Sequence, residues 1–406
     1  MKHAFSFFLL ALFLACCTPM DMYTGAPLEY TVLRQENSGF YDFDKFLAEQ
    51  LEKVENANMS SLIKGVANLL VFLDKSLTFR IAALEYATVD PNGNPVMASG
   101  LVFHPMNRKS KGVVDLLPLA RVGDNGASAE FYASEGLIAL SGYTVILPDL
   151  LGFGVSKETT KSPFLMTENT GRVAYDMRRA AAKYLWDEFG YALPAETIIV
   201  GYSLGGSAAL ATQKYYETYH ARTVKIKEVH AGGGAYDLTA AFDTFSKTGY
   251  SDYPAVPNVI LAFKHYYFDY FGKELALEKV FTGELLANYS DWYSGKYPPD
   301  KIIEMLGSDI HAYMHKDFFK PFEQQNSEFK KLHPYLKENS VSDGWKPQAP
   351  IYLIHSNNDT YVPTACAEVA VKKFRRAGAK ISYTTYPGTH GSVGILFILK
   401  AIIHLS

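Results

Sequence analysis

The stretch that decides the fold is TIIVGYSLGGSAALA, residues 197–211. Its β-branched run Ile198, Ile199 and Val200 is typical of a buried strand, and the Gly- and Ala-rich run after Ser203 is typical of the start of a tightly packed helix. Between them lies a G-x-S-x-G pattern centred on Ser203. A hydroxyl at the tip of so sharp a turn needs neighbours without a Cβ two residues away, because side chains there would collide with the adjoining strand and helix. The stretch therefore predicts a strand, a tight turn and a helix that together present Ser203.

Short apolar runs alternate with longer helical patterns along much of the chain. The predicted strands are residues 112–118, 144–148, 197–200, 226–231, 351–355 and 381–386. The predicted helices are residues 170–189, 205–219, 364–377 and 393–403. This alternation implies crossover connections and an α/β fold, with a mostly parallel sheet and helices on both faces. Two earlier strands, joined by the turn residues 90–94, predict a β-hairpin that adds antiparallel strands at one edge.

The pattern divides the chain into four parts. Residues 1–17 form a leader and residues 18–80 an N-terminal extension, with helical patterns near residues 43–51 and 62–73. The α/β core comprises residues 81–234 and 348–406, and residues 235–347 form an insertion between two strands. Phe, Tyr and Trp make up about 21% of residues 236–345 against about 11% of the rest. Such a composition predicts a helical cap whose aromatic residues pack a small core of their own and line an apolar pocket.

The first residues, MKHAFSFFLLALFLACCTPMD, have the features of a secretory leader. A basic start precedes an apolar run that is too short to span a bilayer and ends beside Cys16 and Cys17. This pair resembles the lipobox of bacterial lipoproteins, in which a cysteine is lipidated and becomes the mature N-terminus. Ala15 favours Cys16 as the lipidated residue and Leu14 favours Cys17, while a plain secretory signal is the alternative. We therefore expect a protein of the bacterial cell envelope, lipid-anchored at the membrane or secreted.

Composition excludes several classes of protein. Hydrophobic residues make up 48% and charged residues 20% of the 406 residues, and the net charge of -3 offers no positive field for nucleic acid. After the leader no segment has the length and hydrophobicity of a transmembrane helix. Cys366 is the remaining cysteine, so the fold depends on its core and not on a disulfide framework.

Two further polar residues follow predicted strands near the C-terminus. Asp359 lies in HSNNDTYVP and His390 in a loop within YPGTHGS. Because the carboxyl ends of parallel strands face one edge of a sheet, we expect Ser203, Asp359 and His390 to meet there. A serine hydroxyl becomes a good nucleophile when an imidazole takes its proton, and a carboxylate fixes the tautomer of that imidazole and stabilises its charged form. The sequence thus predicts a Ser-Asp-His catalytic triad that needs no cofactor and no metal.

These motifs, together with LPDLLGFG at residues 147–154, resemble those of the α/β-hydrolase superfamily. Within it the chain resembles secreted lipases of the fungal lipase A type and bacterial lipoprotein esterases, which place a helical cap in the corresponding interval. The similarity extends over roughly residues 81–406. It implies hydrolysis of carboxylic esters through an acyl-enzyme, and the aromatic cap favours an ester with an apolar acyl or aryl part. A serine peptidase with the same triad, and a non-catalytic lipoprotein that binds a glycan or a partner protein, are the alternatives.

An oxyanion hole should supply two backbone N–H groups. One is expected from Leu204, directly after the nucleophile. The resemblance places the other after the strand at residues 112–118, where related enzymes commonly have His-Gly and this chain has Leu119, Ala120 and Arg121. A backbone donor survives a change of side chain, so Ala120 or Arg121 remains the candidate.

Several other residues could be mistaken for functional ones. Asp237 is the rival for the acid of the triad and is interpreted as a helix cap. His355 is interpreted as a satisfied core imidazole. Asp149 is interpreted as a brace for the loop that contains it, with contact to substrate as the alternative. His311 and His315 have the i,i+4 spacing of a metal pair but lack the glutamate of the zinc-protease motif, so no metal site is predicted there.

Two small-residue features have similarly structural interpretations. Gly232, Gly233 and Gly234 follow a strand without matching a phosphate-binding loop, and they are expected to form a turn into the insertion. Cys366 is expected to be a small buried residue in a helix.

Overall fold

One sheet organises the structure, which is a computed structural model that describes residues 28–38, 57–67, 76–118, 134–294, 297 and 299–406. The described residues form a sheet of nine strands in the order β1-β2-β3-β5-β4-β6-β7-β8-β9. The strands are β1 (Tyr30–Ser38), β2 (Phe79–Val89), β3 (Pro95–Pro105), β4 (Val113–Leu117), β5 (Thr144–Pro148), β6 (Glu196–Tyr202), β7 (Lys225–Gly232), β8 (Ile351–Ser356) and β9 (Ile381–Tyr386). Strands β4 to β9 pair in parallel, whereas β1, β2 and β3 add antiparallel pairs at one edge.

The six predicted strands and the β-hairpin are present, but β1 was not predicted. Strand β1 pairs with β2 from Tyr30 opposite Tyr86 to Ser38 opposite Phe79, with an irregularity between Val32 and Arg34. Its sequence, YTVLRQENS, is largely polar because it lies at the edge of the sheet, and such a strand has little hydrophobic signal. Part of the N-terminal extension therefore joins the sheet.

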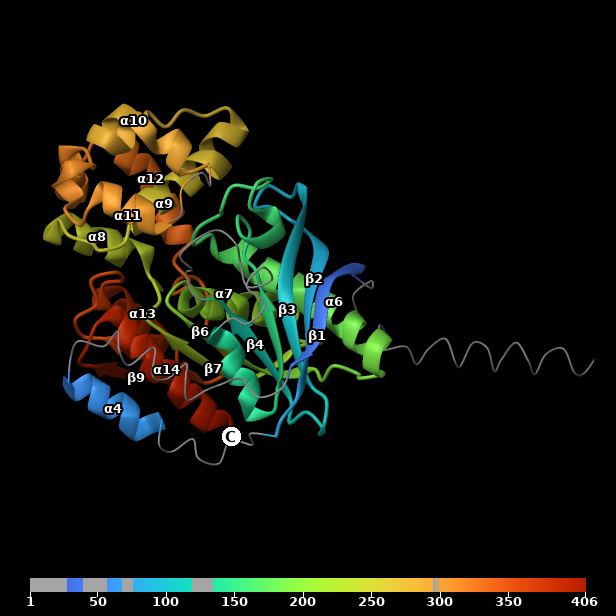
Figure 1. The fold of residues 1–406 in the computed structure, drawn as a ribbon. Helices are drawn as coiled ribbons and strands as arrows, with labels where there is room; N and C mark the ends of the chain where they lie inside the picture. The colour runs from blue at the N-terminus through green and yellow to red at the C-terminus, as the bar shows by residue number, and fades with distance from the viewer. Residues whose placement is uncertain (1–27, 39–56, 68–75, 119–133, 295–296, 298) are drawn as a thin grey trace, which may run out of the picture.

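Helices cover both faces of the sheet, as the sequence predicted (Figure 1). One face of the sheet packs against α6 (Thr167–Phe189), α7 (Leu204–Tyr219) and α13 (Thr364–Arg376). The other face packs against η2 (Ser134–Ser141), α4 (Ala57–Ala67) and α14 (His390–Leu405). Strand β6 serves both cores because successive side chains alternate: Ile198 and Val200 pack with α14, whereas Ile199 packs with α7. Burial on both faces explains why the parallel strands are continuous apolar runs.

The helical patterns in the N-terminal extension have different outcomes. Residues 43–51 lie outside the described residues. Helix α4 covers only part of the second pattern and ends at Ala67, and residues 68–75 again lie outside. Among the helices of the described ranges, none has both the length and the hydrophobicity to cross a bilayer.

Helices replace the strand rhythm between β7 and β8. They are α8 (Leu238–Thr248), α9 (Ala255–Phe263), α10 (Gly283–Trp292), α11 (Pro299–Leu306) and α12 (Ser327–Glu338). Most of the buried aromatic residues here pack in one cluster of this segment, including Phe263, Phe281 and Phe318. In Figure 1 the segment (yellow to orange) lies beyond α13 and on one side of the sheet.

The two ends of this helical segment are held together by hydrogen bonds. The N–H of Leu238 donates to Ser340 Oγ at 2.9 Å, and the Ser342 hydroxyl donates to Asp237 Oδ2 at 2.7 Å. The chain therefore leaves the sheet and returns to it at one place.

Candidate active site

Ser203 occupies a strained turn between β6 and α7. Its φ of 59° and ψ of -123° lie in a region that residues with side chains rarely adopt, at a cost of about 1–3 kcal/mol that the surrounding structure must offset. A Cβ on Gly201 would lie 2.1 Å from the carbonyl oxygen of Gly205, and a Cβ on Gly205 would lie 2.5 Å from that of Leu117. Both glycines of the G-x-S-x-G pattern are thus required by close backbone approach, as predicted.

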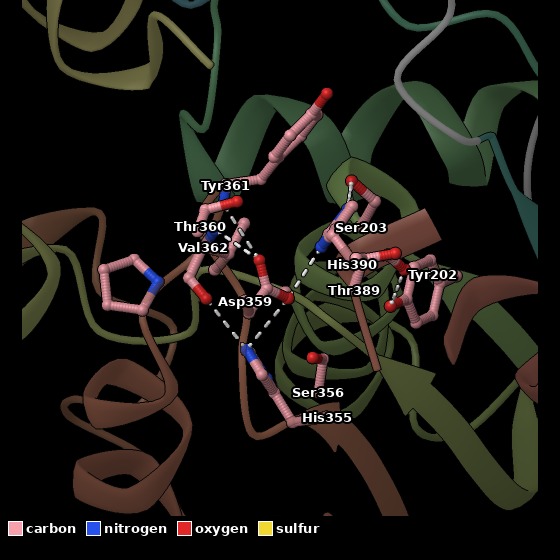
Figure 2. A network of polar contacts seen from close by, with 12 residues as sticks. Tyr202, Ser203, His355, Ser356, Asp359, Thr360, Tyr361, Val362, Thr389 and His390 are labelled. Atoms are coloured by element: carbon pink, nitrogen blue, oxygen red, sulfur yellow. Dashed lines mark hydrogen bonds and ion pairs between the residues drawn. The ribbon is translucent and has the colours of Figure 1, made fainter. Parts of the chain in front are cut away.

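The structure brings the three predicted residues together (Figure 2). Ser203 Oγ lies 2.8 Å from His390 Nε2, and His390 Nδ1 lies 2.7 Å from Asp359 Oδ2. They come from the carboxyl ends of β6, β8 and β9. The imidazole therefore bridges the hydroxyl and the carboxylate, with one ring nitrogen for each.

The sequence predicted a loop at His390, and this was wrong: His390 is the first residue of α14. The predicted helix starts at Val393, whereas the observed helix starts three residues earlier because a capping box closes its first turn. Thr389 Oγ1 accepts from the N–H of Ser392 at 3.3 Å, and Ser392 Oγ accepts from the N–H of Thr389 at 2.9 Å. The capped helix end fixes the backbone of His390.

Asp359 is a fully buried carboxylate with donors on both oxygens. Oδ1 accepts the backbone N–H groups of Tyr361 at 3.0 Å and Val362 at 2.8 Å, and Oδ2 faces His390. His355 Nε2 lies a further 3.4 Å from Oδ2. A buried charge needs such partners, so this loop is built to hold an ionised acid.

His355 has a larger part in this network than a satisfied core imidazole. It is fully buried, and burial lowers its pKa, which keeps the ring neutral. Nε2 donates to the carbonyl of Val362 at 2.9 Å, while Nδ1 finds no hydrogen-bond partner among the described residues. His355 thus supports the loop that carries Asp359, a role for which the i,i+4 spacing of the two residues was the only sequence signal.

Two tyrosines that the sequence analysis did not select hold His390 (Figure 2). The hydroxyl of Tyr202 donates to the His390 carbonyl at 2.6 Å from below the serine turn. The ring of Tyr361 stacks on the imidazole, with centroids 5.1 Å apart and planes inclined by 12°. Tyr202 is the variable residue before the serine and Tyr361 lies two residues after the acid, so both come from motifs already recognised.

Of the three candidate residues for the two oxyanion donors, only Leu204 lies in the described part of the chain. As the first residue of α7, it has a backbone N–H for which its own helix provides no acceptor. Ala120 and Arg121 lie outside the described residues. The end of β4 does reach the turn, because a Cβ on Gly205 would lie 2.8 Å from the carbonyl oxygen of Pro118.

The rival acid, Asp237, lies elsewhere in the network. It caps α8 by accepting from the N–H of Ala240 at 2.9 Å, as interpreted from the sequence. Its other oxygen pairs with Lys373 Nζ at 2.5 Å. Asp359, and not Asp237, therefore faces the imidazole.

The remaining candidates have local partners. Asp149 braces its loop by accepting from the Ser99 hydroxyl at 2.6 Å. His311 lies 2.9 Å from Asp309 and stacks on Phe319, whereas His315 Nδ1 accepts from the backbone N–H two residues later. Cys366 is fully buried in α13, as expected, and burial raises its pKa to about 12.

The family model of the secretory lipases matches residues 132–390, well over half of the chain and including Ser203, Asp359 and His390. The chain belongs to the secretory lipase family. A curated relative, a secreted triacylglycerol lipase of Malassezia globosa, is 41% identical over 68 residues, which are 16% of this chain and 14% of the relative. The match thus spans a small fraction of that lipase.

Solved structures show the same α/β-hydrolase fold at low sequence identity. The rice cell wall degrading esterase LipA of Xanthomonas oryzae is 22% identical, with a TM-score of 0.71 over 92% of this chain and 96% of that one. Candida antarctica lipase A is 16% identical, with a TM-score of 0.59 over 92% and 81%. The fold of this member of the secretory lipase family is therefore shared with enzymes whose sequences have diverged widely.

Proposed function

We propose that this protein is a serine hydrolase that cleaves carboxylic esters through an acyl-enzyme intermediate. The observation that carries the proposal is the chain of contacts from Ser203 Oγ to His390 Nε2 and from His390 Nδ1 to Asp359 Oδ2, at 2.8 Å and 2.7 Å. Membership of the secretory lipase family supports an ester as the substrate, and it supports secretion of the protein.

The chemistry follows from these contacts. Ser203 Oγ attacks the ester carbonyl carbon while His390 Nε2 takes the hydroxyl proton, and Asp359 stabilises the imidazolium that forms. The imidazolium then donates the proton to the departing alcohol, which leaves the acyl group on Ser203. Water gives a proton to the same imidazole as it attacks the acyl carbon, and the imidazolium returns a proton to Ser203 Oγ as the acyl–Oγ bond breaks and the acid leaves.

The negative charge that develops on the carbonyl oxygen needs donors already in place. The N–H of Leu204 is one proposed donor, and a backbone N–H of Ala120 or Arg121 is the other. Removal of one such donor typically costs about 10²- to 10³-fold in turnover. The α7 N-terminus adds a favourable dipole at the same position.

The helical segment at residues 235–347 is proposed to act as a cap over this site. Tyr253 of the segment stacks on Tyr361, which in turn stacks on the imidazole of His390. These aromatic rings beside the site support an ester with an apolar acyl or aryl part.

The N-terminal residues are proposed to direct the protein to the bacterial cell envelope. Lipidation of Cys16 or Cys17 would anchor it to the membrane, and cleavage of a plain leader would release it. A single lipid chain gives only marginal membrane binding, so a stable anchor requires more than one chain.

The proposal is tested with a fluorophosphonate probe and a panel of p-nitrophenyl esters from acetate upward. The wild type should be labelled and should hydrolyse esters, and Ser203→Ala should lose labelling and about 10⁶-fold in kcat. A well-folded wild type that is neither labelled nor active would leave only a binding protein. Activity confined to acetyl esters would contradict the apolar acyl pocket, and a preference for amides would favour the peptidase.

A further inference from the structure

Three side chains with metal-ligating atoms meet at the C-terminal end of α14, remote from Ser203. Glu228 and His230 lie two residues apart on β7 and so point to the same face of the sheet, where His404 reaches them from the last turn of α14. One ligand atom from each lies within 4.8 Å of the others. Helix α14 begins with His390, so about 20 Å of helix separates this cluster from the catalytic imidazole. The C-terminus accordingly lies at the end of the molecule away from the helical segment (Figure 1).

The imidazole of His230 is the unusual member of the cluster. It is only 9% exposed, and its Nε2 has no hydrogen-bond partner among the described residues. Nε2 points at Glu228 Oε1 from 3.4 Å, which is too long for a good hydrogen bond. The ring is held in this orientation by Tyr352, on which it stacks with centroids 4.9 Å apart and planes inclined by 14°. A buried nitrogen that is held in place without a hydrogen bond has lost its contact with water, and a bound ligand could satisfy it instead.

We propose that Glu228, His230 and His404 bind a divalent transition-metal cation of the zinc type through Oε1 and the two Nε2 atoms. Two imidazoles and one carboxylate suit such a cation better than magnesium or calcium, which prefer oxygen ligands. The half-exposed side chain of His404 leaves room for water at the fourth position.

Two of the three separations between ligand atoms are close to this geometry, and the third, between the two imidazole nitrogens, is at most 4.8 Å. Ligand atoms about 2.0–2.1 Å from a tetrahedral zinc ion lie about 3.3 Å from one another. The His230 to Glu228 separation of 3.4 Å already matches this spacing. His404 Nε2 now lies 2.7 Å from Glu228 Oε1, at hydrogen-bond distance, and must withdraw by about 0.6 Å as the cation displaces the shared proton. The half-exposed side chain of His404 permits this shift.

Electrostatics supports the same site. Burial lowers the pKa of His230 to about 4, so the imidazole is neutral and keeps a lone pair for a metal. Burial is the largest single influence on Glu228 and opposes its ionisation, but the hydrogen bond from His404 and the interactions with the two imidazoles together outweigh it, so the pKa of the carboxyl is lowered. A cation here would also lie near the negative end of the α14 dipole. Its effect would be to clamp the last turn of α14 to β7.

The experiment is calorimetric titration of chelator-treated protein with Zn²⁺, together with thermal unfolding at each Zn²⁺ concentration. Wild type should bind one equivalent with a micromolar or tighter Kd, and its Tm should rise with Zn²⁺. Loss of a ligand should weaken binding by about 100-fold or more, so His404→Ala and Glu228→Gln should both lose the shift in Tm. His404 is half exposed, so its truncation should leave the fold intact, which circular dichroism checks.

The matched control is His311→Ala. His311 is an exposed imidazole 2.9 Å from a carboxylate, that of Asp309, but no third ligand was found beside the pair among the described residues. This variant should bind Zn²⁺ like the wild type. Equal Zn²⁺ binding by wild type and His404→Ala, or equal losses in His404→Ala and His311→Ala, would overturn the proposal. Because binding is measured and not hydrolysis, failure of the ester hydrolase proposal would leave this result unaffected.

Discussion

At the scale of single residues, the site depends on one buried carboxylate that is satisfied from every side. Asp359 accepts two backbone N–H groups on one oxygen and faces His390 and His355 with the other. The backbone carbonyl of His390 in turn accepts from the Tyr202 hydroxyl, and the ring of Tyr361 stacks on its imidazole. Such fixation lowers the reorganisation needed when charge develops on the imidazole.

Asp359→Asn should lower kcat by about 10⁴-fold. The Asn side chain has the shape of Asp, but its amide favours the wrong tautomer of His390. Asp237→Asn is the control, since this residue binds Lys373 and caps α8. It should lower Tm but keep kcat within about tenfold of the wild type. The reverse ranking of kcat in the two variants would make Asp237 the acid.

His355→Phe should lower kcat by about tenfold with little change in KM, because His355 positions the acid loop and touches no substrate. His355→Gln offers an amide N–H that can reach the Val362 carbonyl in place of Nε2, so it should recover part of the loss. Steady-state kinetics on one ester measures both constants. Equal kcat in the Phe variant and wild type, with only Tm lowered, would limit His355 to packing.

At the scale of elements, the serine turn is a three-way contact between β4, β6 and α7. Gly205 lies against the carbonyl oxygens of Leu117 and Pro118 at the end of β4, and Gly201 lies against Gly205. The pattern of glycines is readable from sequence because the strand–turn–helix unit is local. Its neighbour β4 is recognised only in the folded chain, since it lies about 80 residues earlier.

Gly205→Ala should destabilise the protein by at least about 2 kcal/mol, because its Cβ would lie 2.5 Å from a backbone oxygen that cannot move freely. Gly391→Ala is the matched control. Gly391 also lies in the first turn of a helix, α14, but a Cβ there would meet no atom within 4 Å. Ala should there be neutral or stabilising by up to about 1 kcal/mol. Urea unfolding measures both, and equal stabilities would contradict the close approach.

At the scale of the whole molecule, the two cores on the faces of the sheet enclose polar groups whose protonation links stability to pH. His104 at the end of β3 is buried between Phe189 and Tyr191, and its Nδ1 lies 2.9 Å from Thr144 Oγ1. Burial lowers its pKa to about 4. As pH falls, His104 is therefore protonated in the unfolded chain before it is protonated in the folded chain. The contribution of neutral His104 to the free energy of unfolding is fully present above the ordinary pKa of about 6.5 and is lost as pH falls toward about 4.

His104→Phe should remove this part of the pH dependence. Between pH 7 and pH 5 the wild type should lose at most roughly 2 kcal/mol through this residue, and the variant should retain that amount. Urea unfolding at the two pH values, with chelator present, compares the losses. Parallel losses in wild type and variant would show that His104 does not carry the effect.

The order of amino acids was sufficient to indicate the parallel strands, the serine turn, the three residues proposed as the triad and the family. Each of these depends on a local pattern: continuous apolar runs for strands buried on both faces, glycines for a crowded turn, and polar residues directly after strands. Three features depended on distant contacts and became visible only in the folded chain. They are the polar edge strand β1, the contacts of Tyr202 and Tyr361 with His390, and the meeting of β7 with the end of α14 at Glu228 and His404. No local pattern encodes them, because the partners lie in different segments and their distances are decided by how the helices pack on the sheet.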